Sequence, residues 1–118
     1  MIKDYKELDV WQKSIELVIE IYDILTVIPL PEKYALVEQI RRSSISVPSK
    51  IAEGYERQTK KEFIQFLYIA LGLLSDVETQ LILINRLYKI DVNQILDKIT
   101  SLRKMLDKLT SALKRRTS

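Results

Sequence analysis

The side chains best suited to a chemical role gather in residues 39–61, where arginines, lysines and serines recur within a segment that reads as a helix. The stretch QIRRSSISVPSKIAEG runs from Gln39 to Gly54, and further cations follow at Arg57, Lys60 and Lys61. Residues 41–61 hold six basic and two acidic side chains, although the whole chain has a net charge of only +3. A second basic cluster occupies residues 114–116, and the remainder is net acidic. Such concentrated positive charge attracts anionic partners.

A helical wheel places one polar face of this segment opposite its apolar stripe. That face holds Arg42, Ser46, Ser49, Lys50, Glu53 and Arg57, with Arg41 on its flank. Guanidinium groups bind phosphate through a planar fork of donors, and neighbouring hydroxyls can add hydrogen bonds. The candidate nucleic-acid-binding residues are Arg41, Arg42, Ser46, Ser49, Lys50, Arg57, Lys60 and Lys61. The alternative is a solvated surface, in which an i,i+4 pair such as Glu53–Arg57 contributes about 0.2–0.5 kcal/mol.

The residue types argue against catalysis and metal binding. The chain contains no cysteine and no histidine, which removes thiolate chemistry, the commonest general base and the commonest metal ligand. Lys50 is the nearest base for the serines at 43–46, but no glycine-rich turn or oxyanion hole accompanies them. The glutamates lack the Glu-x-x-His pattern of di-metal bundles, although Glu78 can pair with an arginine of the second helix. We therefore expect no catalytic residue, no cofactor and no metal site.

The elements that position these residues are predicted to be helices. Only two glycines and three prolines interrupt the chain, and apolar residues recur at steps of three and four. The pattern predicts helices at about 7–27, 33–55, 60–89 and 92–115. Four helices with short connections favour one domain over residues 1–118, folded as an all-α, antiparallel up-down-up-down four-helix bundle.

Local signals define the ends of these helices. Prolines at 29 and 31 end the first helix. Pro48 lies inside the second helix because the apolar stripe continues across it, and Gly54 is a plausible C-terminal cap. Thr59 and Glu62 have the spacing of a capping box that begins the third helix.

Apolar residues outnumber the positions that one bundle can bury. The expected core stripe of the first helix is Leu8, Trp11, Ile15, Val18, Tyr22 and Leu25. That of the third helix is Phe63, Leu67, Ala70, Leu74, Val77, Leu81, Ile84 and Tyr88, and that of the fourth is Val92, Ile95, Ile99, Leu102, Leu106, Leu109 and Leu113. Extra apolar residues lie off the stripes of the first and third helices, at Ile19, Ile21, Ile24, Phe66, Ile69, Leu71, Leu73, Ile82 and Leu83. Large exposed apolar surfaces mark interfaces, so we expect a homo-oligomer. No signal peptide and no apolar run approaching the roughly 20 residues of a membrane span is evident, which favours a cytoplasmic protein without membrane contact.

Several motifs resemble one protein family. They are Leu8-Asp9-Val10-Trp11-Gln12-Lys13, Glu32-Lys33-Tyr34-Ala35-Leu36, the Arg41–Gly54 segment, and Arg57-x-Thr59-x-x-Glu62-Phe63-x-x-Phe66-Leu67-x-Ile69-Ala70-x-Gly72. The family comprises four-helix-bundle proteins encoded in intervening sequences of bacterial large-subunit ribosomal RNA genes. The resemblance covers about residues 5–90. Lys50 departs from it, since asparagine is usual there, and so does Leu73, where serine is common.

The resemblance implies an antiparallel bundle that assembles into a ring, a pentamer, with no known enzymatic activity. Similar bundles are accessory proteins of reverse transcriptases in diversity-generating retroelements, where a basic ring surface contacts nucleic acid. Two hypotheses follow for this chain. It is a non-enzymatic oligomer that binds RNA or a nucleoprotein through the basic face of the second helix, or it is a protein-binding scaffold without nucleic-acid contact.

Overall fold

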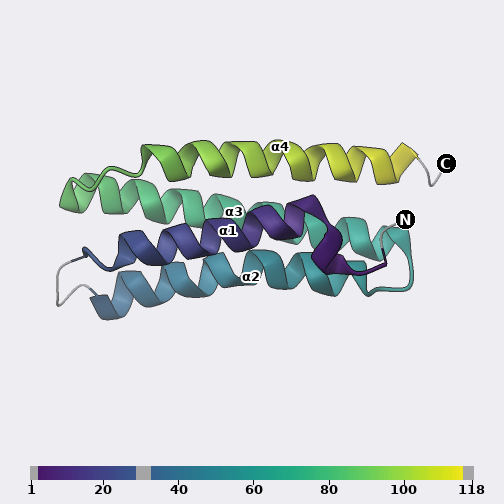
Figure 1. The fold of residues 1–118 in the computed structure, drawn as a ribbon, viewed down its shortest axis with the longest axis horizontal. Helices are drawn as coiled ribbons and strands as arrows, with labels where there is room; N and C mark the ends of the chain where they lie inside the picture. The colour runs from purple at the N-terminus through teal and green to yellow at the C-terminus, as the bar shows by residue number, and fades with distance from the viewer. Residues whose placement is uncertain (1–2, 29–32, 116–118) are drawn as a thin grey trace.

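The chain folds into four helices that run alternately in opposite directions along one long axis (Figure 1). The computed structural model describes residues 3–28 and 33–115. The helices are α1 (Asp9–Leu25), α2 (Glu38–Tyr55), α3 (Lys60–Tyr88) and α4 (Asn93–Arg115). A 3-10 turn, η1 (Tyr5–Glu7), precedes α1, and a π-helical turn, η2 (Lys33–Val37), leads into α2. The fold is the expected all-helical bundle, and the helix bounds lie close to the expected ones.

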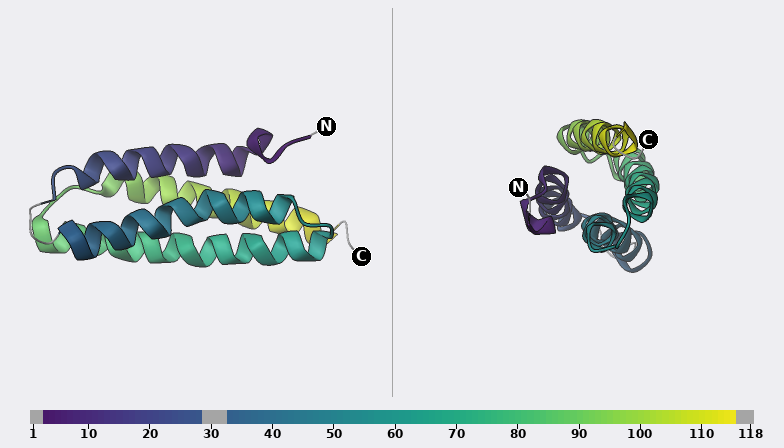
Figure 2. Two further views of the ribbon diagram at one scale, coloured as in Figure 1. Left: turned by 90° about the horizontal axis from the view of Figure 1, so that it is seen from below. Right: turned by 90° about the vertical axis from the view of Figure 1, so that its right-hand side faces the viewer.

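The helices pack in chain order around a shared core. α1 contacts α2, α2 contacts α3, α3 contacts α4, and α4 closes the bundle against α1. The end-on view in Figure 2 shows this arrangement, and the principal extents are 50 × 21 × 20 Å. At about 1.5 Å per residue, the 29 residues of α3 are long enough to run nearly the whole length of the bundle.

The predicted core stripe of α3 is confirmed over most of its length. Its buried residues are Leu67, Ala70, Leu74, Val77, Leu81 and Ile84, and each is fully shielded from solvent. The predicted ends of that stripe, Phe63 and Tyr88, are only partly buried. In α4, Ile95, Ile99, Leu102 and Leu106 are buried as expected. In the last turns of α4 the buried residue is Thr110, whereas Leu109 and Leu113 are only partly buried.

The predicted stripe of the first helix is right at its ends, where Leu8 and Leu25 are buried, and wrong in phase between them. The buried residues are Val10, Ser14, Leu17, Ile21 and Leu25. Trp11, Ile15, Val18 and Tyr22 are half-buried. The reason is that α1 carries two adjacent apolar rows: the row that includes Ser14 faces the bundle centre, and the row of larger side chains lies toward α2. Ile21, expected outside the core stripe, is completely buried.

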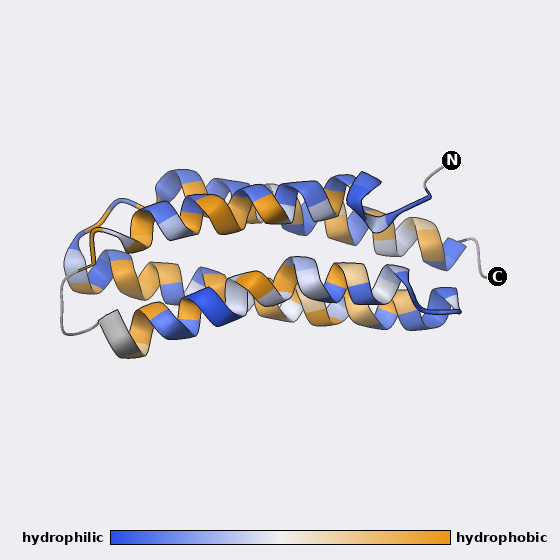
Figure 3. Cartoon of the chain, turned by 60° about the horizontal axis from the view of Figure 1, so that its bottom comes forward, coloured by the Kyte–Doolittle hydropathy of each residue, from blue (hydrophilic) through white to orange (hydrophobic). Residues whose placement is uncertain are grey.

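α3 is also the helix whose length and composition would allow it to cross a bilayer. It contains an 18-residue window of mean hydropathy 1.6, of which 33% is buried in the bundle. The expectation that no apolar segment approaches that length was therefore too strong. The apolar character has a structural reason, because one row of α3 builds the core and others extend toward α2 and α4 (Figure 3).

Pro48 lies inside α2 and is itself buried. Its ring lines a groove with Tyr5, Trp11 and Ile15 on the side of α1. Proline cannot donate the backbone hydrogen bond of its position. The buried row nevertheless continues from Ile40, Ser44 and Val47 to Ile51 and Gly54. Pro48 therefore does not change which row of α2 faces the core, since both halves of the helix present the same row.

Gly54 is not a helix cap, contrary to expectation. It lies within α2, which ends in a right-handed conformation at Glu56, and neither described glycine has a positive φ. A Cβ atom at Gly54 would lie 2.6 Å from Cβ of Phe66 and 3.1 Å from Cδ1 of Phe63. The glycine is needed because α3 approaches the backbone of α2 closely at this point.

Thr59 begins α3 as predicted. Its hydroxyl oxygen accepts the backbone N–H of Glu62 at 3.1 Å, and the hydroxyl proton is donated to Oε1 of Glu62, also at 3.1 Å. The Glu62 carboxylate thus accepts from the threonine side chain.

Near the N-terminus, Asp4 caps η1. The Lys6 backbone N–H donates to the Asp4 carboxylate, which lowers the pKa of this exposed group. The predicted stop at Pro29–Pro31 lies outside the described residues.

Candidate nucleic-acid interface

Arg41 turns away from the predicted polar face and toward α1. Its guanidinium carbon lies 5.3 Å from the centre of the Tyr22 ring, and Nη1 lies 3.9 Å from the Glu38 carboxylate. Its Nε atom is buried and has no hydrogen-bond partner among the described residues. Stacking on an aromatic face and a nearby carboxylate satisfy much of this cation. Arg41 therefore contributes less available charge than the sequence suggested.

The serines of α2 hydrogen-bond to the preceding turn of their own helix. Ser46 donates to the carbonyl of Arg42 at 2.8 Å, and Ser49 donates to that of Ile45 at 3.0 Å. Ser44 does the same toward Arg41 and is buried. A phosphate requires donors, and these hydroxyl protons are already committed to carbonyls. Ser46 and Ser49 lie on the expected face but do not present their protons to an anion.

Lys50 and Arg57 share a carboxylate and an aromatic ring. Glu53 lies between them, 3.4 Å from Nζ of Lys50 and 4.0 Å from Nη2 of Arg57, so the expected Glu53–Arg57 pair is present. The Arg57 guanidinium carbon lies 4.7 Å from the centre of the Phe66 ring, and Lys50 Nζ lies 5.9 Å from it. The Glu53 carboxylate and the face of the Phe66 ring thus partly offset the positive charges of Lys50 and Arg57.

Arg42, Lys60 and Lys61 are the exposed cations of the predicted set that carry no ion pair within the described ranges. Arg42 lies on the outer face of α2, and the two lysines open α3 directly after the capping residue Thr59. The α2–α3 turn that contains them is strongly hydrophilic (Figure 3). The freest positive charge therefore lies at this turn and on the outer face of α2.

Two aromatic residues near this turn were not assigned to the site from sequence. Phe66 is partly buried under Arg57 and Lys50, and Tyr68 is 45% exposed. The Lys114 ammonium lies 4.8 Å from the centre of the Tyr68 ring. The basic cluster at 114–116 was visible in the sequence, but the proximity of Lys114 to α3 depends on the topology of the bundle.

Glu78 does not form the pair with an α2 arginine that the sequence allowed, nor is it fully exposed, the alternative. It pairs instead with Arg103 of α4, with 3.0 Å between Nη2 and Oε1, and both side chains are about one-third exposed. The same guanidinium reaches the Ser75 hydroxyl at 3.5 Å. On the wheel of α3, Glu78 lies on the side of α4, whereas Gln80, which bonds to Ser43, lies on the side of α2.

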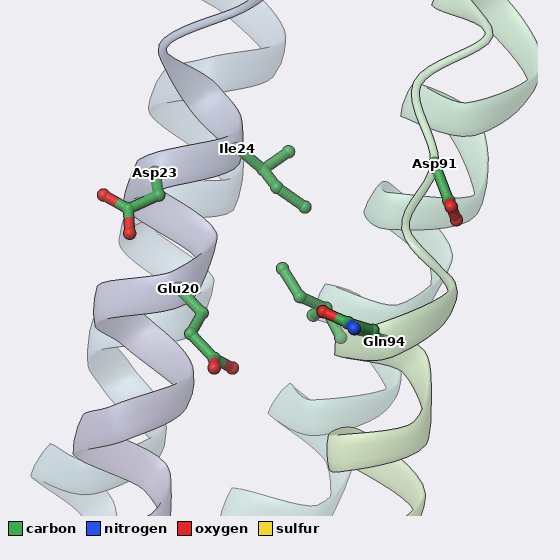
Figure 4. A pocket seen from close by; sticks show the side chains of 6 residues that line it. Glu20, Asp23, Ile24, Asp91 and Gln94 are labelled. Atoms are coloured by element: carbon green, nitrogen blue, oxygen red, sulfur yellow. The ribbon is translucent and has the colours of Figure 1, made fainter.

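A second polar site lies at the opposite end of the bundle, between the end of α1 and the start of α4. Its cavity of about 330 Å³ is lined by Glu20, Asp23, Ile24, Asp91, Gln94 and Ile95. Figure 4 shows Glu20 and Gln94 projecting toward the space between the helices, whereas Asp23 points away from it. Glu20 contacts the Lys98 ammonium. Within residues 3–28 and 33–115, no group of three or more potential ligands is arranged to hold a metal ion.

Exposed cations and two aromatic rings lie on the part of the described surface formed by α2, the start of α3 and the end of α4. Cations on α2, at the α2–α3 turn and at the end of α4 alternate with two aromatic rings. Such a combination suits a polyanion that also carries flat groups, which describes a nucleic-acid strand.

Comparison with known proteins places the chain in a family. Residues 6–108 match the model of the 23S rRNA-intervening sequence protein family. A crystal structure of a protein of unknown function from the S23 ribosomal protein family of Bacteroides thetaiotaomicron superposes with a TM-score of 0.77. The two sequences are 27% identical, and the match covers 86% of this chain and 97% of the other. No curated protein matches. The chain belongs to the 23S rRNA-intervening sequence protein family, as its motifs indicated.

Proposed function

We propose that the protein is a non-enzymatic, cytoplasmic helical bundle that binds RNA or a nucleoprotein through the outer face of α2 and the α2–α3 turn. The observation that supports this is that Arg42 on the outer face of α2, and Lys60 and Lys61 after the α2–α3 turn, are exposed and carry no ion pair with another described residue. Exposed cations bind phosphates and release counterions from the nucleic acid. Lys50 and Arg57 make a smaller contribution because Glu53 and Phe66 already hold them.

The test is a titration of structured ribosomal RNA fragments at several salt concentrations. The variant Arg42→Gln/Lys60→Gln/Lys61→Gln should bind more weakly. The slope of log affinity against log salt should fall by up to about 2, since each contact to a single strand contributes about 0.7.

A matched control replaces three other exposed cations, Arg86, Lys89 and Lys104, by glutamine. It changes net charge equally but lies away from the proposed surface, so its affinity should stay close to that of the parent. Equal losses in both triple variants would reduce the interaction to general charge attraction and would contradict a defined site. No binding by the parent at low salt would refute RNA binding altogether.

We also propose that the protein is a homo-oligomer, and the family resemblance points to a pentamer. Exposed apolar residues support self-association: Ile19 on α1 is 59% exposed, and Ile69, Leu83 and Leu87 on α3 are 47%, 45% and 61% exposed. Burial of such residues between copies would remove apolar surface from water. Sedimentation equilibrium at micromolar concentration tests this, and a single species of 13.8 kDa would contradict it.

The same apolar residues favour a second candidate function, a protein-binding scaffold without nucleic-acid contact. Salt separates the two candidates. Phosphate contacts weaken steeply as salt rises, whereas an apolar interface does not. Binding of a protein partner that persists at high salt and is lost in Leu83→Lys/Leu87→Lys would favour the scaffold.

A further inference from the structure

Two basic segments that are far apart in the sequence meet at one corner of the bundle. α3 begins and α4 ends at the same end of the molecule (Figure 1). Tyr68, two turns into α3, joins them: the Lys114 ammonium contacts its hydroxyl and lies 4.8 Å from the centre of its ring. Lys60 and Lys61 on α3 and Lys114 and Arg115 on α4 are all exposed. We call this group the α3–α4 corner.

Tyr68 differs from the other aromatic residues near the basic surface. Phe66 is partly buried, and its Cβ packs against the backbone at Gly54, so that ring helps to join α2 to α3. Tyr68 is 45% exposed and belongs neither to the buried core nor to the residues packed against it. A ligand can therefore contact the exposed Tyr68 ring without disturbing the core.

We propose that the α3–α4 corner binds single-stranded RNA, with one base stacked on Tyr68 and the adjoining phosphates bound by Lys60, Lys61, Lys114 and Arg115. A nucleotide complements both the Tyr68 ring and the Lys114 ammonium. Its base can stack on the ring in place of the ammonium, and its phosphate can then bind the displaced ammonium. Bases in a duplex are stacked inside and cannot reach the ring, so the corner selects unpaired strands.

The inference rests on the proposed function, in that the partner is RNA, and it names a second contact surface and the form of RNA preferred. The corner continues the proposed interface, because Lys60 and Lys61 belong to both. The Glu62 carboxylate, next to Lys60 and Lys61 in the sequence, is partly buried and accepts the Thr59 hydroxyl, while the Glu62 backbone N–H donates to the oxygen of that hydroxyl. A strand that follows the α2–α3 turn reaches Tyr68 two helical turns into α3.

The experiment compares three probes with the full chain: an oligoadenylate, an abasic oligonucleotide of the same length and backbone, and an RNA duplex. The parent should bind the oligoadenylate at least about fivefold more tightly than the abasic strand, because a stacked base adds affinity that phosphates do not. Tyr68→Leu should remove this preference and leave abasic binding unchanged, whereas Tyr68→Phe should retain it. Lys114→Gln should weaken binding of all three probes.

Tyr22→Leu is the matched control, because Tyr22 also lies under a cation, Arg41, but on α1. The Tyr22→Leu variant should prefer the oligoadenylate over the abasic strand by the same factor as the parent. Equal binding of oligoadenylate and abasic strand by a parent that does bind RNA would overturn the inference and leave the proposed function standing. Failure of the parent to bind any probe would refute both.

A crosslinking measurement needs no variant and covers the case in which Tyr68→Leu fails to fold. Irradiation of the parent bound to a 4-thiouridine-containing strand should attach it within residues 62–86, the tryptic peptide that contains Tyr68. Attachment confined to other peptides would overturn the inference.

Discussion

The α2–α3 seam and the α1–α4 seam hold the same bundle together in different ways. Between α2 and α3 the backbones approach so closely that no Cβ fits at Gly54, and Gln80 of α3 reaches Ser43 of α2 at 3.2 Å. Three hollows line the α1–α4 seam instead, with volumes of about 330, 410 and 350 Å³. The close seam joins the two helices that carry most of the proposed RNA contacts.

The difference follows from side-chain size. The helix α2 presents small residues to its neighbours at Ser43, Ser44 and Gly54, which lets the helix axes come together. The α1–α4 seam is bordered by long charged side chains, among them Lys13, Glu16, Glu20, Lys98 and Lys108. These side chains extend toward water, so hollows remain along this seam. We expect the α2–α3 pair to be the rigid half of the molecule.

The largest effect is expected for Gly54→Ala. The new Cβ would meet Phe66 Cβ at 2.6 Å, and that atom cannot move without α3, so overpacking should cost about 2 kcal/mol of unfolding free energy. Gly72→Ala is the matched control, since nothing lies within 4 Å of its Cβ position, and it should stabilise by about 1 kcal/mol through helix propensity. Chemical denaturation measures both. Equal effects at the two glycines would contradict the close seam.

Pro48→Ala should stabilise the bundle by about 1 kcal/mol. Removal of a helix-interior proline should raise the free energy of unfolding by about 3 kcal/mol. Loss of two buried methylenes should lower it by about 0.8 kcal/mol each. The substitution leaves the α2–α3 seam unchanged, because Pro48 faces Trp11, Ile15 and Val18 of α1. Thermal unfolding checks the sign. A loss of stability would mean that the ring's packing in the α1–α2 groove outweighs the restored backbone hydrogen bond.

The sequence predicted the apolar rows within one helix, but it predicted only in part which row of a helix packs against which neighbouring helix. The α3 stripe from Leu67 to Ile84 followed from its spacing alone. In α1, two apolar rows lie side by side, and spacing could not show that the row with Ser14 faces the core. Burial of a small serine in place of Trp11 depends on how closely the other helices approach, which no single helix encodes.

The candidate site shows the same division. The polar face of α2 was predicted as a set, but the availability of each charge depends on partners elsewhere in the fold. Arg41 is held by Tyr22 on another helix, and Phe66 of α3 lies beneath Arg57. The proximity of Lys114 to Tyr68 joins residues 46 positions apart and requires the antiparallel topology. Charge along a sequence therefore identified the region but not its freest cations.

Filling a hollow of the α1–α4 seam should stabilise the molecule. Ala112 lines the hollow of about 410 Å³ together with Leu8, Val10, Met105 and Leu109. Ala112→Leu adds three carbon atoms there, and partial burial at about 0.8 kcal/mol per methylene predicts a gain of about 1 kcal/mol. Ser111→Leu, at an exposed neighbouring position, is the control and should give no gain. A loss of stability in Ala112→Leu would indicate that the seam has no room.

The smallest effects concern the ion pairs on either side of α4. Glu78 and Arg103 join α3 to α4 through two oxygen–nitrogen contacts, 3.0 and 3.5 Å long, and both side chains are about one-third exposed. Glu20 and Lys98 join α1 to α4, but Lys98 is more exposed, and Oε2 of Glu20 is buried without a hydrogen-bond partner in the part of the chain that the structure describes. Exposed pairs contribute about 0–1 kcal/mol, and bidentate geometry places a pair at the upper end of that range.

Double-mutant cycles should therefore give a coupling of about 0.7 kcal/mol for Glu78→Gln with Arg103→Met, and about 0.3 kcal/mol or less for Glu20→Gln with Lys98→Met. Both couplings should shrink as salt rises, because the charges are only partly shielded from solvent. A larger coupling for Glu20–Lys98 would mean that this pair actively closes the α1–α4 seam. The contrast between a close apolar seam and a loose polar one would then have to be replaced by two seams of similar strength, one joined by packing and the other by charge.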